Sequence, residues 1–210
     1  MGLGALLFTN PVLFFILALL LLYSVIVHEV AHGWVASRFG DDTARQYGRL
    51  TLNPLSHLDV MGTLMLFLVG FGWAKPVPVD YRRLRGGRVA FVSVALAGCA
   101  ANILIASIAL LLLQVAAVNT QPVFAALLPI VVRINIILGS FNLIPIPPLD
   151  GSKILMSILP REAQVALARI EPYGFFILAV LLYTGRLNPM IMFMQRLVYG
   201  FITGMFGFFR

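Results

Sequence analysis

The chain has 210 residues, of which 60% are hydrophobic and 11% charged, and its mean hydropathy is +0.97. Soluble domains average roughly 45–50% apolar and about 25% charged residues, so this composition predicts an integral membrane protein and excludes an ordinary soluble one. The net charge of +7 does not indicate nucleic-acid binding, because membrane proteins collect Lys and Arg in their cytoplasmic loops. The length allows one domain, 1–210. Cys99, the single cysteine, cannot form an internal disulfide and is expected to be a small buried packing residue.

Residues 11–37 predict the first membrane-spanning helix. Asn10 is a suitable N-cap and Pro11 a suitable first helical residue, and nothing breaks the pattern before residue 37. A helix of this length measures about 40 Å, enough to cross a hydrocarbon core of ~30 Å. His28 lies about 26 Å along the axis from Pro11, so it is expected inside the bilayer but near its far side. The N-terminus has no basic region that would indicate a cleavable signal peptide.

A shorter apolar stretch near 57–80 predicts a re-entrant or hairpin element in place of a full span. Its apolar part, VMGTLMLFLVGFGWA, is short for a span and is interrupted by glycines. Basic residues flank it on both sides, and the positive-inside rule then puts both flanks in the cytoplasm. Irregular backbone at membrane depth is tolerated only against protein or a water-filled cavity. The alternating prolines of KPVPVD are typical of an extended edge segment.

Four further apolar stretches follow this element. Residues 89–118 and 123–147 predict two spans, which the uncharged loop NTQP connects. Residues 173–184 and 189–209 predict one or two C-terminal membrane elements, the first of which is short and the second interrupted by an arginine. The expected fold is therefore an all-α polytopic membrane protein with about four to six membrane elements.

The distribution of basic residues predicts the orientation of the chain. Most of the 15 lysines and arginines fall in stretches that are expected on the cytoplasmic side: Arg38, Arg45, Arg49, Lys75, Arg82, Arg83, Arg85, Arg88, Lys153, Arg161 and Arg169. The positive-inside rule then puts the N-terminus outside and the end of the first helix at the cytoplasmic face. The chain is thus expected to be a multi-pass protein of the cell membrane.

Residues 28–32 read HEVAH and fit the pattern H-E-x-x-H near the end of the first apolar helix. Residues i and i+4 share a helix face, so both imidazoles can bind one zinc ion, and Glu29 can act on a bound water as general base. Zinc suits imidazole ligands and lowers the pKa of bound water towards ~7. A chance match is disfavoured, because each ionisable group at membrane depth costs about 2–3 kcal/mol.

Two histidines do not complete a hydrolytic zinc site, which usually needs a third protein ligand. A metzincin-type third histidine is excluded by Arg38, and no Glu stands between Glu29 and Glu162 to act as a soluble-type ligand. Six candidates remain: Asp41, Asp42, His57, Asp59, Asp80 and Asp150. Asp41, Asp42 and Asp80 lie in arginine-rich polar loops, where solvated salt bridges are their expected role. His57 and Asp59 enter an apolar run and are stronger competitors.

Asp150 is the strongest candidate for the third ligand. It follows the proline-rich run SFNLIPIPPL, which predicts an extended, stiff chain, and it precedes Gly151 and an expected helix start. The one adjacent cation is Lys153, so a metal is the most economical partner for this carboxylate. The alternative is that Asp150 is a plain helix N-cap.

Two motifs together resemble the site-2 protease family of intramembrane zinc metalloproteases. The first is HEVAH in a predicted transmembrane helix, and the second is NLIPIPPLDG far downstream. The second family motif, N-x-x-P-x-P-x-L-D-G, is met by Asn142, Pro145, Pro147, Leu149, Asp150 and Gly151. Gly98 and Asn102 also match a G-x-x-x-N element in the intervening helix. The resemblance covers most of the chain and is specific, because separate motifs occur in the right order.

The resemblance implies one zinc ion per chain, bound by His28, His32 and Asp150, with Glu29 as the base and the site near the cytoplasmic face. It also implies that Asn142 steadies the scissile carbonyl or its oxyanion. The alternative roles of Asn142 are a helix–helix hydrogen bond or a helix end before the prolines.

Gly98 and Asn102 are expected to serve close helix packing, since small residues and amides hold membrane helices together. The chain has no room for a PDZ or CBS module, so a short form of the family is expected, and a prokaryotic source. Its partners are expected to be the lipid bilayer and a transmembrane protein substrate, without nucleic acid.

The resemblance implies hydrolysis of peptide bonds within or near transmembrane segments, as in regulated intramembrane proteolysis. A substrate helix must unwind before cleavage, and the segment Val60–Asp80 is hypothesised to hold the unwound chain by strand addition. Two alternatives remain open. One is a divalent-metal transporter that uses the same His and Asp groups. The other is a different membrane H-E-x-x-H enzyme, such as a prenyl-protein-type endopeptidase, with its third ligand at Glu162 or Glu171.

Overall fold

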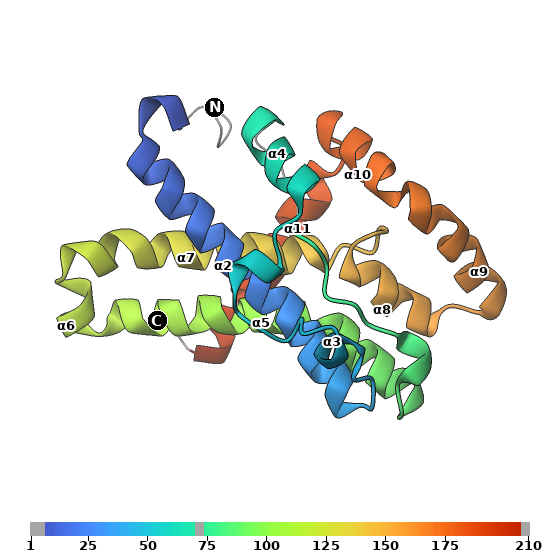
Figure 1. Cartoon of the computed structure of the whole chain (residues 1–210). Coiled ribbons are helices and arrows are strands. Elements are labelled where there is room, and N and C mark those ends of the chain that lie inside the picture. Colours follow the sequence, from blue (N-terminus) through green and yellow to red (C-terminus); the bar gives the residue numbers. More distant parts are fainter. Residues whose placement is uncertain (1–6, 70–73, 207–210) are drawn as a thin grey trace.

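The computed structural model of the chain describes residues 7–69 and 74–206 (Figure 1). Within these residues all helices and turns are of the α or 3-10 type, and the one β-type pairing is an isolated antiparallel bridge between Leu58 and Ala74. Four of the described stretches are long and apolar enough to cross a membrane. The expected fold class, an all-α polytopic membrane protein, is confirmed.

Three of these four stretches are single helices: α2 (Pro11–Arg38), α5 (Gly87–Gln114) and α7 (Pro122–Asn142). The fourth runs over Arg161–Tyr183 and is built from α9 (Arg161–Ile170), the 3-10 turn η3 (Glu171–Tyr173) and α10 (Gly174–Tyr183). The C-terminal membrane element that the sequence indicates at 173–184 is thus the second half of a longer apolar stretch.

Shorter elements connect or follow these helices: α3 (Thr43–Gln46), η1 (Pro54–Ser56), α4 (Val60–Val69), η2 (Tyr81–Arg83), α6 (Ala116–Asn119), α8 (Asp150–Ile158) and α11 (Asn188–Phe206). α11 lies where the sequence indicates an element at 189–209, of which residues 207–209 lie outside the described residues. It is not one of the four stretches that qualify as membrane spans.

Helix α2 begins where its sequence predicts. The side chain of Asn10 accepts a hydrogen bond of 3.1 Å from the backbone N–H of Leu13, and Pro11 occupies the first helical position. The helix ends at Arg38, and the chain turns away at Gly40, whose φ of +98° suits glycine. The motif HEVAH therefore lies in the C-terminal half of an unbroken helix.

Helix α5 is central to the molecule. It packs against α2, α7 and α8, and in Figure 1 it runs beside α7, to which α6 joins it at one end, while α2 crosses this pair. Most of its buried residues are small: Ala90, Ala95, Ala97, Gly98, Cys99, Ala106, Ser107 and Ala109. Small side chains let helix backbones approach closely. Cys99 is buried among them, as expected.

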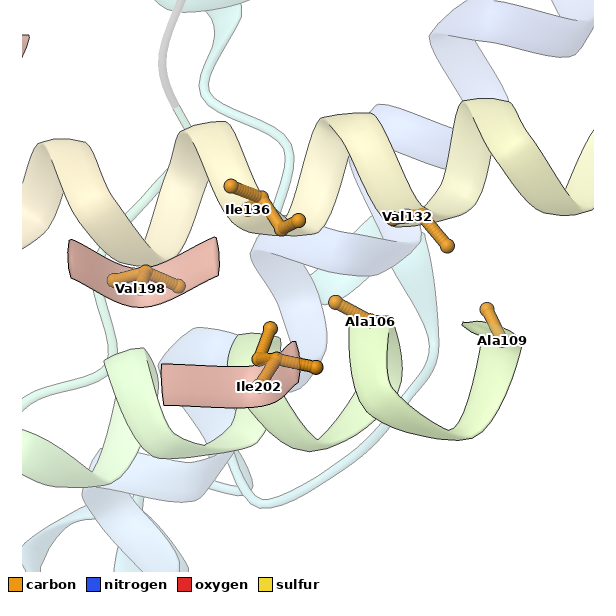
Figure 2. Close-up of a cluster of buried hydrophobic side chains, with 6 residues drawn as sticks. All are labelled: Ala106, Ala109, Val132, Ile136, Val198 and Ile202. Atoms are coloured by element: carbon orange, nitrogen blue, oxygen red, sulfur yellow. The ribbon is translucent and has the colours of Figure 1, made fainter. Parts of the chain in front are cut away.

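An apolar cluster joins α5, α7 and α11 (Figure 2). Its six buried members are Ala106, Ala109, Val132, Ile136, Val198 and Ile202. The alanines of α5 leave room for the branched side chains of the other two helices, which Figure 2 shows pointing into the same space. This cluster holds α5 and α7 together. About one turn away along the same helices, Asn102 of α5 and Asn135 of α7 are close enough to form a hydrogen bond of 2.8 Å.

The stretch near 57–80 is a hairpin-like excursion. The chain leaves the base of this excursion as α4, and residues 70–73, which follow α4, lie outside the described residues. At its base, Leu58 and Ala74 form the isolated bridge, and the N–H of Lys75 donates a 2.8 Å hydrogen bond to the carbonyl of His57. Both ends of the excursion therefore lie together. Its position in the bilayer remains a prediction.

The proline-rich run after α7 departs from the expected extended chain. α7 ends at Asn142 and does not continue to the predicted 147, because closely spaced prolines cannot extend a helix. The run folds into compact turns, in which the N–H of Ile146 donates to Ile144 at 2.8 Å and that of Leu149 to Ile146 at 2.9 Å. The expectation of an extended chain is wrong, and the turns bring α8 back against α5.

Candidate metal centre

Two histidines of α2 lie close together inside the molecule. The Nε2 atoms of His28 and His32 are 3.1 Å apart, as residues four apart on one helix face can be. The two residues are only 5% and 7% exposed. Their rings are therefore removed from solvent and point at a common centre.

Asp150 completes a triangle with these histidines. Its Oδ2 lies 3.0 Å from Nε2 of His28 and 3.2 Å from Nε2 of His32. Among the described residues, these three form the group whose ligand atoms could hold one metal ion. Leu149, not Asp150, is the N-cap of α8, and no side chain caps that helix. The carboxylate of Asp150 is thus directed to the histidines.

The glycine of the L-D-G sequence explains how Asp150 reaches this position. Gly151 packs so closely on the end of α7 that a Cβ atom there would lie 2.5 Å from the carbonyl oxygen of Ile144. Any larger residue would push α8 away from the turns that precede it. Because Asp150 is in the first turn of α8, its carboxylate is fixed by this contact together with the packing of α8 on α5.

Each histidine has a partner on its Nδ1 atom. Nδ1 of His32 lies 2.7 Å from the carbonyl oxygen of Val94, and Nδ1 of His28 lies 2.7 Å from Oδ1 of Asn102. A backbone carbonyl can only accept, so His32 carries a proton on Nδ1, and Nε2 is the nitrogen that faces the common centre. Partners of this kind orient metal-binding imidazoles in other proteins.

Gly98 and Asn102 do more than the expected helix packing. Gly98 faces both histidine rings, and a Cβ atom on it would lie 2.5 Å from Nε2 of His28. Asn102 contacts Nδ1 of His28 directly. The sequence indicated both residues only through the G-x-x-x-N pattern, and helix packing alone does not predict their contact with the ligands.

The triangle fits a zinc ion. Zinc ligands at about 2.0–2.1 Å in a tetrahedral arrangement are separated by about 3.3 Å, close to the distances between the three donor atoms here. Two imidazole nitrogens and a carboxylate oxygen this close together need protons or a metal ion between them, and one zinc ion can satisfy all three. Two histidines with one carboxylate are also a known ligand set of catalytic zinc sites that keep a position open.

Glu29 lies beside this triangle but is not part of it. Its Oε2 accepts a 2.9 Å hydrogen bond from the backbone N–H of Val77, in the segment KPVPVD. Arg49, which is buried, donates to the carbonyls of Lys75 at 2.8 Å and Pro76 at 3.3 Å. These bonds hold an extended segment against the glutamate that follows the first histidine.

His57 and Asp59 have structural roles in the described structure. Nε2 of His57, which is fully buried, lies 2.8 Å from the carbonyl oxygen of Thr51. Asp59 accepts a 2.8 Å hydrogen bond from the N–H of Gly62 and so caps the start of α4. Neither is brought to the two histidines of α2.

The loop aspartates behave differently from one another. Asp42 pairs with Arg45 at 3.3 Å, and Asp80 pairs with Arg82 at 3.0 Å, as expected for exposed salt bridges. Hydrogen bonds from Arg82 hold the pKa of Asp80 below its ordinary value. The expectation of a solvated salt bridge is wrong for Asp41, which is fully buried and accepts a 2.7 Å hydrogen bond from the N–H of Asp80. That bond anchors the end of the extended segment.

The remaining candidates have other partners or stand outside the metal-binding group. The amide of Asn142 donates a 3.1 Å hydrogen bond to the carbonyl of Leu138 within α7. Glu171 pairs with Lys153, and Glu162 is exposed at the start of α9. The role of Asn142 near a reacting carbonyl remains a prediction.

Several curated proteins are similar to this chain. "Putative zinc metalloprotease YwhC" of Bacillus subtilis is 40% identical over 175 residues, which are 80% of each chain. "Putative zinc metalloprotease Rip2" of Mycolicibacterium smegmatis is 35% identical over 173 residues, 80% of this chain and 66% of that protein. "Zinc metalloprotease MJ0392" of Methanocaldococcus jannaschii is 27% identical over 159 residues, 76% of this chain and 39% of that protein. No solved structure matches the chain.

The apolar helices and the buried ligand triangle define a membrane metalloprotease. The family model of Peptidase family M50 matches residues 113–184, which contain the Asp150 motif. With the relatives above, this match shows that the chain belongs to Peptidase family M50, the site-2 proteases, as the two sequence motifs predicted. Zinc as cofactor is confirmed by the ligand set and by these relatives. A multi-pass membrane protein of a prokaryote is likewise supported by the four apolar stretches and by bacterial relatives.

Proposed function

We propose that this protein is an intramembrane zinc metalloprotease that hydrolyses peptide bonds within or near transmembrane segments of membrane proteins. The observation that carries the proposal is the convergence of Asp150 on His28 and His32. All three belong to a molecule whose helices are apolar enough to span a bilayer. A protease site in this setting acts on chains that share the membrane with it.

Each residue has a role that follows from its chemistry. His28, His32 and Asp150 would hold the zinc ion, which acts as a Lewis acid and makes water nucleophilic near neutral pH. Glu29, adjacent to His28, would take a proton from the attacking water and later pass it to the leaving amine. Asn142 would donate to the oxygen that becomes negative, which requires it to leave its bond with Leu138.

The extended segment beside Glu29 supports a binding mode for the substrate. A transmembrane helix hides its carbonyls in internal hydrogen bonds, so the cleaved stretch must unwind and adopt an extended form. The segment is fixed by Arg49 at Lys75 and Pro76, and by Asp41 at Asp80. A peptide that added to it as a strand would lie next to the proposed base.

The orientation follows from charge. Arg38 ends α2 close to the motif, and η2 carries further arginines, which favour the cytoplasmic side. The proposal therefore puts the site towards the cytoplasm and the N-terminus outside. Cleavage there would release soluble parts of substrates into the cytoplasm, as regulated intramembrane proteolysis requires.

Belonging to a protease family argues against the transporter alternative, and the position of Asp150 argues against a third ligand at Glu162 or Glu171. The test is Glu29→Gln in purified protein, with zinc content and cleavage of a transmembrane peptide both measured. We expect zinc to be retained and cleavage to fall by about 10²-fold or more, since the proton acceptor is lost. Glu162→Gln, at an exposed position, is the matched control. Intact cleavage by Glu29→Gln would end the proposal.

A further inference from the structure

We propose that Asn135 is a positioning residue for the metal centre, which acts through Asn102 to fix the tautomer of His28. The proposal rests on the zinc site described above, but not on the identity of its substrate. Asn135 lies in α7, and its side-chain hydrogen bonds go to Val131, Asn102 and Ser24 and to none of the three zinc ligands. It is fully buried, as is Asn102, and no part of the two sequence motifs includes it.

The contacts form a continuous line of hydrogen bonds across three helices. Nδ2 of Asn135 donates to the carbonyl of Val131 at 2.9 Å, and its Oδ1 accepts from Nδ2 of Asn102 at 2.8 Å. Oδ1 of Asn102 lies 2.7 Å from Nδ1 of His28. The line thus starts at a backbone carbonyl of α7, passes through α5 and ends at the imidazole on α2.

The starting carbonyl determines the direction of every bond in this line. A carbonyl can only accept, so the atom of Asn135 that faces Val131 must be its nitrogen, and the atom that faces Asn102 must be its oxygen. Asn102 must then turn its nitrogen to Asn135 and its oxygen to His28. An oxygen there can only accept, so Nδ1 of His28 must carry the proton. Nε2 is then the nitrogen through which His28 can bind the metal.

Ser24 provides an independent check on the same directions. Its backbone carbonyl accepts from Nδ2 of Asn102 at 3.2 Å. Its hydroxyl donates to the carbonyl of Leu20 at 2.8 Å and therefore accepts from Nδ2 of Asn135 at 3.0 Å. Both contacts require the amide orientations that the carbonyl of Val131 imposes. Turning either amide over would set oxygen against oxygen in a place that water does not reach.

The two histidines depend on different supports. His32 is fixed by the backbone of Val94, which no side-chain substitution removes. Nδ1 of His28 instead faces the side-chain amide of Asn102, and that amide is oriented by Asn135 and Ser24. A neutral imidazole has two tautomers, and the one with its proton on Nε2 cannot bind a metal there. The packing of α7 on α5 therefore controls whether His28 is ready to bind zinc.

Nitrogen NMR of the purified protein tests this directly, because the chain has only three histidines. In protein labelled with ¹⁵N-histidine, we expect a proton on Nδ1 of His28 both with and without zinc, because Oδ1 of Asn102 can only accept. Asn135→Leu removes the shorter of the two bonds that hold Nδ2 of Asn102 and leaves only the 3.2 Å contact with the carbonyl of Ser24, so a population of His28 without a proton on Nδ1 should appear. Zinc affinity, measured by competition with a chelator, should fall about 10–100-fold, as on loss of other outer partners of metal-binding histidines.

Two variants control for structural damage. Burial at this position favours the protonated form of Asn135→Asp, which donates to the carbonyl of Val131 and accepts from Asn102, so the proton on Nδ1 of His28 and the zinc affinity should remain near those of the wild type. Ser140→Ala removes another buried polar group of α7, one that bonds only within its own helix, and should change neither. If Asn135→Leu does not fold, Asn135→Ala tests the same link. In every variant the nitrogens of His32 report whether the site is still assembled.

Two results would overturn the proposal. One is a wild-type protein whose His28 carries no proton on Nδ1. The other is an Asn135→Leu or Asn135→Ala variant that keeps both the tautomer and the zinc affinity of the wild type. Neither result depends on cleavage, so a failure of the proposed protease function would be seen separately, in Glu29→Gln.

Discussion

Oδ2 of Asp150 lies 3.2 Å from Nε2 of His32, although 118 residues of sequence separate them. The contact links the first turn of α8 to the end of α2, with α5 packed against both helices. It turns a pair of helical histidines into a three-ligand set. The predictions below test this contact and the residues that surround it.

Asp150→Asn should abolish stable zinc binding. The amide keeps the size of the side chain but loses the negative charge that holds the cation against two neutral imidazoles. We expect zinc affinity to fall by more than the roughly 10–100-fold that loss of an outer partner costs. Asp59→Asn and Glu162→Gln are the matched controls, and metal analysis after dialysis is the measurement. A third ligand elsewhere is indicated if either control loses zinc while Asp150→Asn keeps it.

Gly98→Ala should weaken zinc binding through a clash with the histidines. A methyl group there would lie 2.5 Å from Nε2 of His28, so the rings would have to move. Alanine is a better helix former than glycine by about 1 kcal/mol, so α5 itself is not weakened by this change. Gly200→Ala in α11 meets no atom within 4 Å and is the control. Chelator competition should show roughly a 10-fold or larger loss for Gly98→Ala alone, and equal affinities would contradict this account of Gly98.

Val79→Pro should reduce substrate capture if the extended segment binds the unwound chain. Proline removes an N–H that makes no hydrogen bond within the described part of the chain, so the internal bonds at Val77 and Asp80 stay intact. We expect KM for a transmembrane peptide to rise several-fold with zinc content unchanged. Val79→Ala keeps the N–H and serves as control. Proline substitution of Val77, Asp80 and Tyr81 extends the test, and unchanged cleavage throughout would contradict strand addition.

Asn142→Asp should lower kcat while zinc content stays constant. The substitution removes a hydrogen-bond donor and adds negative charge, which opposes an oxyanion; loss of such a donor costs about 10²–10³ in kcat. Ser140→Ala, in the last turns of the same helix, is the control. A normal kcat in Asn142→Asp assigns the residue to its bond with Leu138 at the end of α7.

Local patterns of the sequence predicted much of the fold. The bounds of α2 follow from Asn10, Pro11 and an unbroken apolar run, all of which act within one helix. The short glycine-containing stretch near 57–80 indicated an excursion whose ends meet, and the bridge of Leu58 with Ala74 closes it. The proline-rich run was harder to predict. Prolines forbid a helix but do not by themselves choose between an extended chain and the compact turns that form here.

The loop aspartates show the same limit at the level of single residues. Composition groups Asp41 with Asp42 and Asp80, since all three lie among arginines. Only the path of the segment before η2 brings the N–H of Asp80 to the carboxylate of Asp41, and that contact makes Asp41 a buried acceptor. Burial of a loop residue depends on which distant segment covers it, and sequence spacing does not contain that information.

The sequence by itself determined the membrane class, the helical fold and the pair His28 and His32, because hydrophobic length and the i, i+4 spacing are properties of a single helix. The tertiary structure decided which of the six acidic or histidine candidates approaches that pair. It also decided that Asn102 contacts His28 and that Asn135 contacts Asn102. These contacts depend on how closely α2, α5 and α7 pack and on where the turns before α8 place its first residue, Asp150. Both are set by contacts between residues far apart in the chain.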